Sequence, residues 1–302
     1  MQKAYATRLW HENHPAVDLG GTKLAAALIR GNEIIEKHQV ETQSSDNSDV
    51  LRGALRDLLI PLSDRADNVA VASTGIIDNG VLTALNPDNL GGLNRFPIQT
   101  VISDLTGLPT QVINDAQAAA WAEFQAYNAH YSNLAFITVS TGVGAGLVLD
   151  GKLKTGARGV AGHAGHMLAD PWGSRCGCGR TGCVEVIASG TAMGRAGVPF
   201  FGVETTGRDV YTHYLAGSED AAVIVTRSAS TIAQLIADLT ILLDLDAVVL
   251  GGSVGLAEGY LQLVKDALSL LPTVYQPELL PALSGADAGL IGVSLWAGTE
   301  TK

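Results

Sequence analysis

The chain has 302 residues, which at roughly 150 residues per domain is long enough for two domains. It carries 19 Lys and Arg residues against 30 Asp and Glu residues, so its formal net charge is −11. This acidic balance argues against a general affinity for nucleic acid or anionic membranes, because both need a basic face. Hydrophobic residues make up 47% of the chain and charged residues 16%, which allows a large buried core.

Neither a membrane span nor a secretory signal is expected. The most apolar stretch, residues 232–251, contains Asp238, Asp244 and Asp246, and each of these carboxylates is costly in hydrocarbon. Residues 1–15 are interrupted by polar and charged residues where a signal peptide needs an apolar run. We therefore expect a cytoplasmic protein.

The first regular pattern covers residues 16–35. Short apolar runs flank Gly20 and Gly21, and a second turn follows at Gly31, which predicts strands joined by glycine turns. Apolar spacing predicts a helix over residues 50–62. Further strands are predicted over residues 68–72 and 109–113, and an alanine-rich helix opens at Asn114 and Asp115 and runs through residue 124.

A similar pattern returns about 120 residues later, which suggests a duplicated unit facing a shared cleft. A strand over residues 136–140 leads into a small-residue loop over 141–146, a strand over 147–149 and a turn at Asp150 and Gly151. The order that follows is a helix over residues 229–243, a strand over 247–250, a turn over 251–253 and a helix over 256–271. We expect two α/β domains, residues 1–114 and 115–285, with a C-terminal helix at about 286–302 completing the first.

Three loops of small residues follow predicted strands. They are residues 18–23, with the sequence Asp-Leu-Gly-Gly-Thr-Lys, residues 141–146, and residues 251–253. Glycine amides can approach an anion closely, and the Asp18 carboxylate can hold a hydrated Mg²⁺. Each loop alone is equally well explained as a tight turn or close strand packing, and the spacing of a Walker P-loop is absent. Together the three loops favour a nucleotide-binding cleft.

Asp115 allows two interpretations. As the first residue of a helix that follows a strand, it suits the helix N-terminus, a local structural role. It is equally placed to act as a general base that accepts a proton from a bound hydroxyl during phosphoryl transfer. Asn114, next to it, could hydrogen-bond the substrate hydroxyl.

The chain's three cysteines, Cys176, Cys178 and Cys183, lie close together in the sequence, after His163 and His166. One histidine with three cysteines satisfies the closed tetrahedral arrangement of a structural Zn²⁺ site. Spacing alone does not decide which histidine would bind. The alternative is a set of free thiols, and an iron–sulfur cluster is disfavoured because it normally needs a fourth cysteine.

The combination of these motifs resembles the ROK family of sugar kinases, within the actin-like ATPase (ribonuclease H-like) group. The motifs that carry the resemblance, in family order, are residues 18–23, Asn114 and Asp115, residues 140–144, and the segment from Gly162 to the Gly-Cys-Val-Glu run at residues 182–185. The resemblance implies two duplicated α/β domains around a cleft, with ATP and Mg²⁺ as cofactors.

A narrower resemblance is to the branch of this family that acts on N-acetylmannosamine. It is carried by residues 72–77, 85–87, 89–93, 114–119 and 251–260. It implies ATP-dependent phosphorylation of the sugar 6-hydroxyl, giving N-acetylmannosamine 6-phosphate in sialic acid breakdown. Many relatives have Glu where His163 stands, so this position leaves the choice of sugar open.

The resemblance also implies a role for individual residues, with Asp115 as the general base. The implied sugar-binding residues are Gly75, Asn89, Asn114, Asp115, His163, His166 and Glu185. The implied ATP-binding residues are Asp18, Gly20, Gly21, Thr22, Lys23, Thr141, Gly142, Val143, Gly144, Gly251 and Gly252. The implied zinc ligands are His166, Cys176, Cys178 and Cys183.

Three other functions share part of this pattern. A glucokinase or another hexose or N-acetylhexosamine kinase of the family would keep the chemistry and change the sugar. A sugar-responsive repressor of the family would need a helix-turn-helix domain, but only 17 residues precede Asp18 and the net charge of −11 disfavours DNA. A sugar-binding protein without catalysis conflicts with the presence of Asp18, Asp115 and both phosphate loops. The family resemblance further implies a homodimer.

Overall fold

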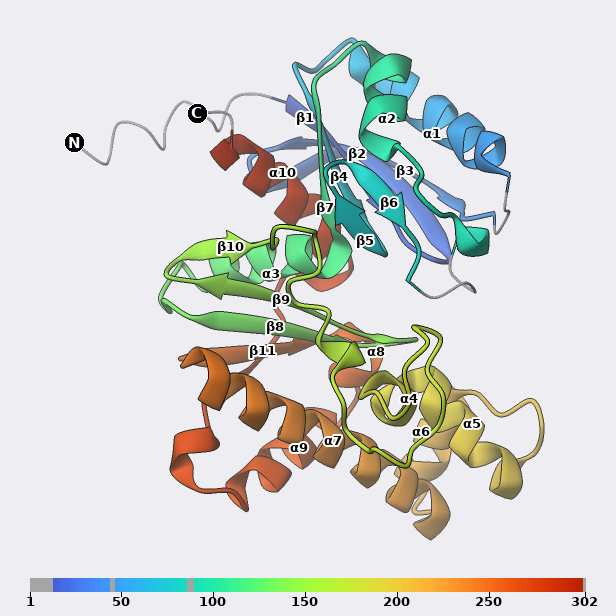
Figure 1. Ribbon diagram of the computed structural model, residues 1–302, viewed down its shortest axis with the longest axis vertical. Helices are drawn as coiled ribbons and strands as arrows, with labels where there is room; N and C mark the ends of the chain where they lie inside the picture. The colour runs from blue at the N-terminus through green and yellow to red at the C-terminus, as the bar shows by residue number, and fades with distance from the viewer. Residues whose placement is uncertain (1–12, 44–46, 86–89, 301–302) are drawn as a thin grey trace. The chain divides into compact units, whose positions relative to one another are not determined.

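The computed structural model describes residues 13–43, 47–85 and 90–300 of the chain (Figure 1). They form two compact units. Unit 1 holds the described parts of residues 1–128, 153–161 and 284–302, and unit 2 holds residues 129–152 and 162–283. The expected boundary after residue 114 therefore differs from the observed division, because the helix that starts at Asp115 packs within unit 1.

Unit 1 is built on a five-stranded sheet with the order β3-β2-β1-β4-β7. Its strands are β1 (Asn13–Leu19), β2 (Lys23–Arg30), β3 (Glu33–Glu41), β4 (Val69–Ser73) and β7 (Thr110–Asn114). β1, β2 and β3 are antiparallel neighbours, whereas β1, β4 and β7 run parallel. The strands predicted in this part of the chain are confirmed, and the carboxyl ends of β1, β4 and β7 lie at one edge of the sheet.

Helices cover both faces of this sheet, and the alternation of side chains along β1 separates the two faces. Val17 and Leu19 pack in the core beneath α1 (Ser48–Ser63) and α2 (Ile98–Thr106). Ala16 belongs to the core on the opposite face, with residues of α3 (Asp115–Ala126) and α10 (Ala288–Glu300). Figure 1 shows α1 and α2 on one side of the sheet and α10 on the other. Asp18, which alternates with Val17 and Leu19, is therefore directed toward the face of α10.

The helices α3 and α10 touch through their backbones. A Cβ added to Gly292 of α10 would lie 1.8 Å from the carbonyl oxygen of Ala118 in α3, so only glycine fits there. The predicted C-terminal helix thus packs in unit 1. A small hairpin of β5 (Ile76–Asp78) and β6 (Val81–Thr83), followed by the turn η3 (Leu90–Gly92), also belongs to this unit and was not predicted.

Unit 2 repeats the sheet of unit 1. Its order is β10-β9-β8-β11-β12, formed by β8 (Leu134–Val139), β9 (Val143–Leu149), β10 (Lys152–Lys154), β11 (Ala247–Gly251) and β12 (Glu278–Pro281). β8 is antiparallel to β9 and parallel to β11, as β1 is to β2 and β4. The matching order and directions confirm the predicted duplication. The loop expected over residues 141–146 is shorter than predicted, because Val143 already pairs with Val139 of β8.

Helices of unit 2 pack on its sheet through one large core. They are α4 (Glu185–Ala188), α5 (Gly190–Phe201), α6 (Gly207–Leu215), α7 (Glu219–Leu243), α8 (Gly252–Gly255) and α9 (Tyr260–Ser269), with the short turns η4 (Ala164–His166) and η5 (Thr273–Tyr275). α7 begins ten residues before the predicted start at 229. In place of the turn expected at residues 251–253, β11 ends at Gly251 and α8 begins at Gly252. The helix predicted over 256–271 is shorter in the structure, where it is α9.

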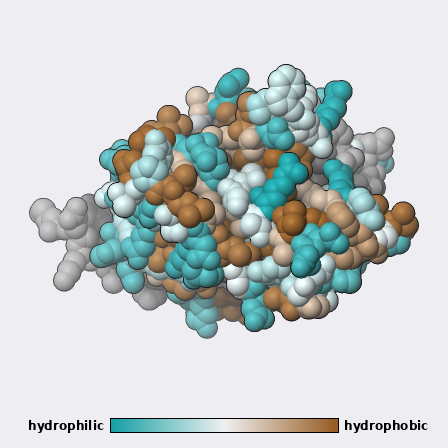
Figure 2. Space-filling view, turned by 90° about the horizontal axis from the view of Figure 1, so that it is seen from below, coloured by the Kyte–Doolittle hydropathy of each residue, from teal (hydrophilic) through white to brown (hydrophobic). Residues whose placement is uncertain are grey.

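Among the described residues, α7 is the one helix with the length and apolar composition of a membrane span, but 56% of its most apolar window is buried. Ile232, Ile236 and Leu239 of α7 lie in the core of unit 2, so α7 is a core helix. Its solvent side also carries Ile241 and Leu242. The face drawn in Figure 2 shows apolar side chains in several separate groups with polar side chains between them.

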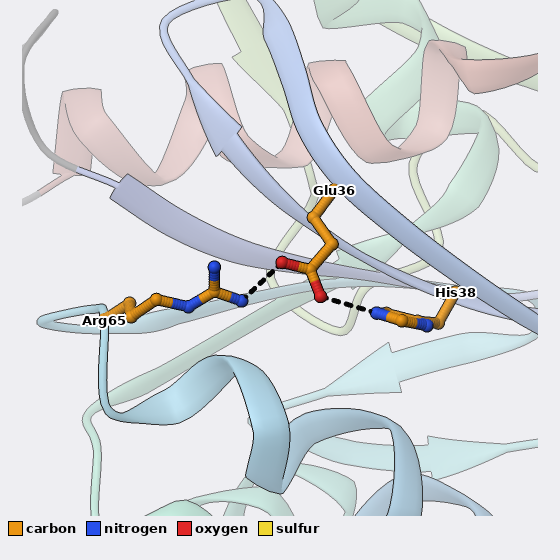
Figure 3. Close-up of polar contacts among 3 residues, drawn as sticks. All are labelled: Glu36, His38 and Arg65. Carbon is orange, nitrogen blue, oxygen red and sulfur yellow. Dashed lines mark hydrogen bonds and ion pairs between the residues drawn. The ribbon is translucent and has the colours of Figure 1, made fainter.

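β3 is an edge strand of unit 1, and its outer surface is charged. Glu36 accepts hydrogen bonds from Arg65 Nη2 (2.6 Å) and from His38 Nε2 (2.7 Å) (Figure 3). The hydrogen bond from His38 has the larger effect and that from Arg65 the next, and together they hold the pKa of Glu36 below its usual value. Charged side chains on an edge strand disfavour pairing with the edge of another chain, which gives this cluster a structural role.

Candidate active site

The predicted site residues fall into two sets, one in each unit. In unit 1, Asp18 lies near the end of β1, and Asp115 is the first residue of α3, directly after β7. β1, β4 and β7 are parallel neighbours, so both carboxylates belong to the edge where these strands end. In open α/β sheets, this edge is where ligands bind.

Both carboxylates have raised pKa values, and the charge of Asp115 contributes to the shift of Asp18. Burial, and next the Asp115 charge, raise the pKa of Asp18 to about 7, whereas the Lys37 ammonium acts in the opposite direction. Burial likewise raises the pKa of Asp115 above its usual value. The residue as a whole is nevertheless partly accessible to solvent. A carboxyl with a raised pKa at a helix start has the properties of a general base.

Asn114 fixes the start of α3. Its Oδ1 accepts hydrogen bonds from the amides of Ala116 (2.9 Å) and Gln117 (3.3 Å), which forms a capping box, and its Nδ2 donates to the carbonyls of Gly75 (3.0 Å) and Ser73 (3.4 Å). Both amide hydrogens are thus used within unit 1. In this conformation Asn114 positions Asp115 and Gly75, and its predicted contact with a sugar stays a prediction.

The first glycine loop leaves backbone amides open. The Gly20 amide donates to the Lys23 carbonyl (2.9 Å), and Thr42 Oγ1 donates to the Gly20 carbonyl (2.9 Å). The amides of Gly21 and Thr22 donate no hydrogen bond to any of the described residues, and both residues are exposed. Unpaired amides in a glycine loop beside Asp18 suit the binding of phosphate oxygens.

Three residues around Asp18 were missed by sequence reasoning. Lys37 of β3 forms an ion pair with Asp287, just before α10, although 250 positions separate them. A Cβ added to Gly289, in the first turn of α10, would lie 2.9 Å from Asp18 Oδ2. No local pattern links these residues to Asp18, because the fold brings them together from the two ends of the chain.

In unit 2, the second glycine loop lies between β8 and β9. The Ser140 carbonyl accepts from the Gly190 amide (2.7 Å), and Ser140 Oγ lies 3.1 Å from Ser253 Oγ at the start of α8. The amides of Thr141 and Gly142 donate to no partner within the described chain. Gly252 has a φ of 86° and its Cβ would lie 2.3 Å from the Val139 carbonyl oxygen, so only glycine fits there. The loops at 141 and 251 are therefore neighbours within unit 2.

Glu185 begins α4, and its carboxylate reaches the second loop. Glu185 Oε2 accepts a hydrogen bond from the Val143 amide (3.0 Å). His163 immediately precedes η4, which ends at His166. Glu185, His163 and His166 are all in unit 2, whereas Gly75 and Asn114 are in unit 1. Asn89, the remaining predicted sugar ligand, lies outside the described residues.

His166, Cys176, Cys178 and Cys183 come together, with their ligand atoms within 4.8 Å of one another. His166 Nδ1 lies 3.6 Å from Cys176 Sγ, and Cys178 Sγ lies 3.7 Å from Cys183 Sγ. Donors about 2.3 Å from a central ion in a tetrahedron are about 3.8 Å apart, so the four groups fit a metal of that geometry. Burial raises the pKa of the Cys183 thiol to about 12. A bound cation would offset that cost, because metal binding deprotonates the thiol.

Comparison with known proteins decides the family. Residues 15–300 match the ROK family. The chain belongs to the ROK family. An N-acetylmannosamine kinase from Escherichia coli O1:K1 is 51% identical to it over 286 residues, which cover 94% of this chain and 98% of that protein.

Solved ROK structures share the fold. A ROK hexokinase from Thermus thermophilus superposes with a TM-score of 0.84 and 32% identity, over 96% of this chain and 100% of that one. A ROK glucokinase from Streptomyces griseus, in complex with glucose and AMPPNP, has a TM-score of 0.77 and 27% identity, over 93% and 98% of the chains. The expected fold, the actin-like ATPase type with duplicated α/β domains, is confirmed.

Proposed function

We propose that this ROK protein is a kinase that transfers the terminal phosphoryl group of ATP to the 6-hydroxyl of N-acetylmannosamine. The observation that carries the proposal is the Asp115 carboxyl, which has a raised pKa and is held at the start of α3 beside Asp18. The choice of sugar is supported by the 51% identity to the Escherichia coli N-acetylmannosamine kinase.

In this reaction Asp115 accepts the proton of the 6-hydroxyl as that oxygen attacks the terminal phosphorus. Proton transfer to a positioned base is most effective when the pKa of the base lies near the working pH, and burial moves Asp115 in that direction. The capping bonds of Asn114 set the position of the α3 start and therefore of the base. Asp115 is the catalytic residue of this proposal.

The nucleotide is bound by two sets of residues. In unit 1 these are Asp18, Gly20, Gly21, Thr22 and Lys23. In unit 2 they are Thr141, Gly142, Val143, Gly144, Gly251 and Gly252. Unpaired amides in both loops support contacts to phosphate oxygens. The acidic Asp18 suits a hydrated Mg²⁺, which arrives with ATP and neutralises charge on the phosphates.

The sugar is bound by Gly75, Asn89, Asn114, His163, His166 and Glu185. His166, Cys176, Cys178 and Cys183 would hold a structural Zn²⁺ and so fix the loop that carries the two histidines and precedes Glu185. With four protein ligands, the ion would stabilise this loop and would not activate a water.

We further propose a cytoplasmic homodimer whose product, N-acetylmannosamine 6-phosphate, belongs to sialic acid breakdown. The expected dimer rests on the resemblance to the ROK family. Light scattering on the purified protein tests the dimer. The proposal predicts the mass of two chains, and the mass of one chain would contradict it.

A coupled assay of ATP consumption tests the function. Zinc-loaded protein with Mg²⁺ and ATP is offered N-acetylmannosamine, N-acetylglucosamine, glucose and mannose in parallel. The proposal predicts the highest kcat/KM for N-acetylmannosamine. A clear preference for glucose would keep the kinase and reject the sugar, and the absence of sugar-stimulated ADP formation from folded protein would reject the kinase.

A further inference from the structure

The contact between Glu185 and the second glycine loop has a consequence beyond sugar binding. The phosphate loop is defined here as residues 140–144. We propose that Glu185 is also a positioning residue for this phosphate loop, so that one carboxylate links the sugar site to the nucleotide site. The proposal rests on the proposed function, which assigns the phosphate loop to ATP and Glu185 to the sugar.

The first support is the hydrogen bond from the Val143 amide to Glu185 Oε2 (3.0 Å). Hydrogen bonds to a carboxylate are stronger than those between neutral groups, and this one holds the end of a loop that is otherwise rich in glycine. Gly142 lies against the same oxygen, since an added Cβ would be 2.6 Å from Oε2. The position of the carboxylate thus depends on having no side chain at residue 142.

The second support is that the residues after Glu185 hold the same loop. The Gly190 amide donates to the Ser140 carbonyl (2.7 Å), and the Thr191 amide donates to the Thr141 carbonyl (3.3 Å). A Cβ on Gly190 would lie 2.9 Å from the Ser140 oxygen, so the two backbones touch. The path of the phosphate loop is therefore set by residues 185–191.

The third support is that the same segment begins at the metal-binding set. Cys183 lies two residues before Glu185, and the Val184 amide donates to the carbonyl of Met167, next to His166 (2.9 Å). Gly165 lies directly on β9, because an added Cβ would be 2.0 Å from the Val143 carbonyl oxygen. The loop of residues 163–183, which carries His166 and the three cysteines, is called the His/Cys loop. The His/Cys loop, Glu185 and the phosphate loop are thus one packed assembly within unit 2.

The carboxylate has a second oxygen that can serve the sugar. Glu185 Oε1 accepts no hydrogen bond from any residue that the structure describes. A sugar hydroxyl can donate to Oε1 while Oε2 keeps the Val143 amide, so binding of the sugar fixes the carboxylate that holds the loop. Sugar and nucleotide should then raise each other's affinity by the same factor.

Calorimetric titration of Mg-ADP tests the proposal, with and without N-acetylmannosamine. Glu185→Ala removes both contacts, and we expect the dissociation constant of ADP without sugar to rise about ten-fold. Glu185→Gln retains an oxygen for the Val143 amide but turns an NH₂ toward the sugar. This variant should keep the ADP affinity of the wild type, weaken sugar binding and lose the coupling between the two ligands.

Gly142→Ala keeps residue Glu185 but displaces its carboxylate. Because Gly142 is itself assigned to ATP, this variant supports the proposal only in combination with Glu185→Ala. We expect it to weaken ADP binding as Glu185→Ala does. Gly53→Ala is the matched control, since an added Cβ meets nothing within 4 Å there. Zinc content and circular dichroism establish that each variant is folded.

An ADP affinity that stays at the wild-type value in both Glu185→Ala and Gly142→Ala would overturn the proposal. So would a loss of ADP affinity in Glu185→Gln as large as that in Glu185→Ala. Turnover of N-acetylmannosamine by the wild type shows whether the link or the proposed function has failed. Wild-type protein that fails to phosphorylate N-acetylmannosamine while Glu185→Ala still weakens ADP binding would reject the sugar and retain the link. The reverse pattern would reject the link alone.

Discussion

Among single residues, Asp18 has a position that does not help the protein to fold, because its carboxylate lies in largely apolar surroundings. Its neighbours Val17 and Leu19 are buried in an apolar core, and its own pKa is raised to about 7, mainly by burial. Burying a carboxylate beside Asp115 costs stability that apolar residues would not. Such a cost is typical of a site kept for a ligand, and the proposed function assigns this position to the hydrated Mg²⁺ of the nucleotide.

This cost predicts how stability depends on pH. Between pH 3.8 and about 7 the folded chain keeps a proton on Asp18 that the unfolded chain has lost. Stability rises with pH only where the unfolded state binds more protons, so this group makes the ligand-free protein less stable as pH rises through that window. Asp18→Asn should be more stable than the wild type at pH 8 by about 1–3 kcal/mol, with a smaller difference at pH 4.

Urea unfolding of the ligand-free protein at several pH values measures this difference. Asp57→Asn, at an exposed carboxylate of α1 in the same unit, is the control and should match the wild type. If Asp18→Asn follows the wild-type curve at every pH, the buried carboxyl carries no such cost.

At the scale of elements, the first turn of α10 sets the place of Asp18. Gly289→Ala would put a methyl group 2.9 Å from Asp18 Oδ2 and push the carboxylate aside. A misplacement of about 1 Å in a site can cost about 100-fold in rate, so we expect kcat to fall about 10–100-fold. Gly53→Ala, in the interior of α1, should leave kcat unchanged. A Gly289→Ala enzyme with wild-type kcat would show that this contact does not matter.

The His/Cys loop leads to a separate prediction, because either His163 or His166 could supply the fourth metal ligand by its place in the sequence. His166 Nδ1 lies 3.6 Å from Cys176 Sγ, inside the set of four donors, and His163 is not part of that set. His166→Ala and Cys178→Ser should both lose the zinc, and His163→Ala should retain about one ion per chain. Elemental analysis of the purified variants measures this. Full zinc content in His166→Ala would reassign the ligand.

Periodic elements could be predicted from the sequence, and elements that depend on distant contacts could not. β1, β4 and α1 follow from local spacing of apolar residues, and α3 follows from its alanines and the Asn114 cap. α5 contains Gly194, Gly197 and Pro199, which gives it low helix propensity. It forms because those glycines allow close packing, with a Cβ on Gly197 only 2.5 Å from Val210 of α6.

The same distinction holds for the candidate site. The glycine loops, Asp18, Asp115 and the His/Cys set are marked by short local patterns, so the sequence predicted them. Lys37, Asp287 and Gly289 carry no local pattern, because their relation to Asp18 arises only when α10 returns to unit 1. The bond from Val143 to Glu185 spans 42 positions and was missed for the same reason.

For the molecule as a whole, each of the two duplicated sheets carries a glycine loop with unpaired amides, and the proposed base lies in unit 1. Both sheets have the same strand order, and a glycine loop follows the first strand of each. In unit 1 the helix after the last parallel strand starts with Asp115, whereas the chain leaves unit 2 after β12, because residues 284–302 belong to unit 1. In the proposed function, the duplicated loops bind the nucleotide and Asp115 acts as the base.

The proposed mechanism depends on Asp115 taking the proton of the sugar hydroxyl. The most direct test compares sugar-dependent ADP formation by the wild type and by Asp115→Asn, with calorimetry of N-acetylmannosamine binding to both. We predict that kcat falls about 10²–10⁴-fold while the sugar still binds, because Asn keeps the size of Asp and loses its basicity. An Asp115→Asn enzyme that turns over at the wild-type rate would contradict the account.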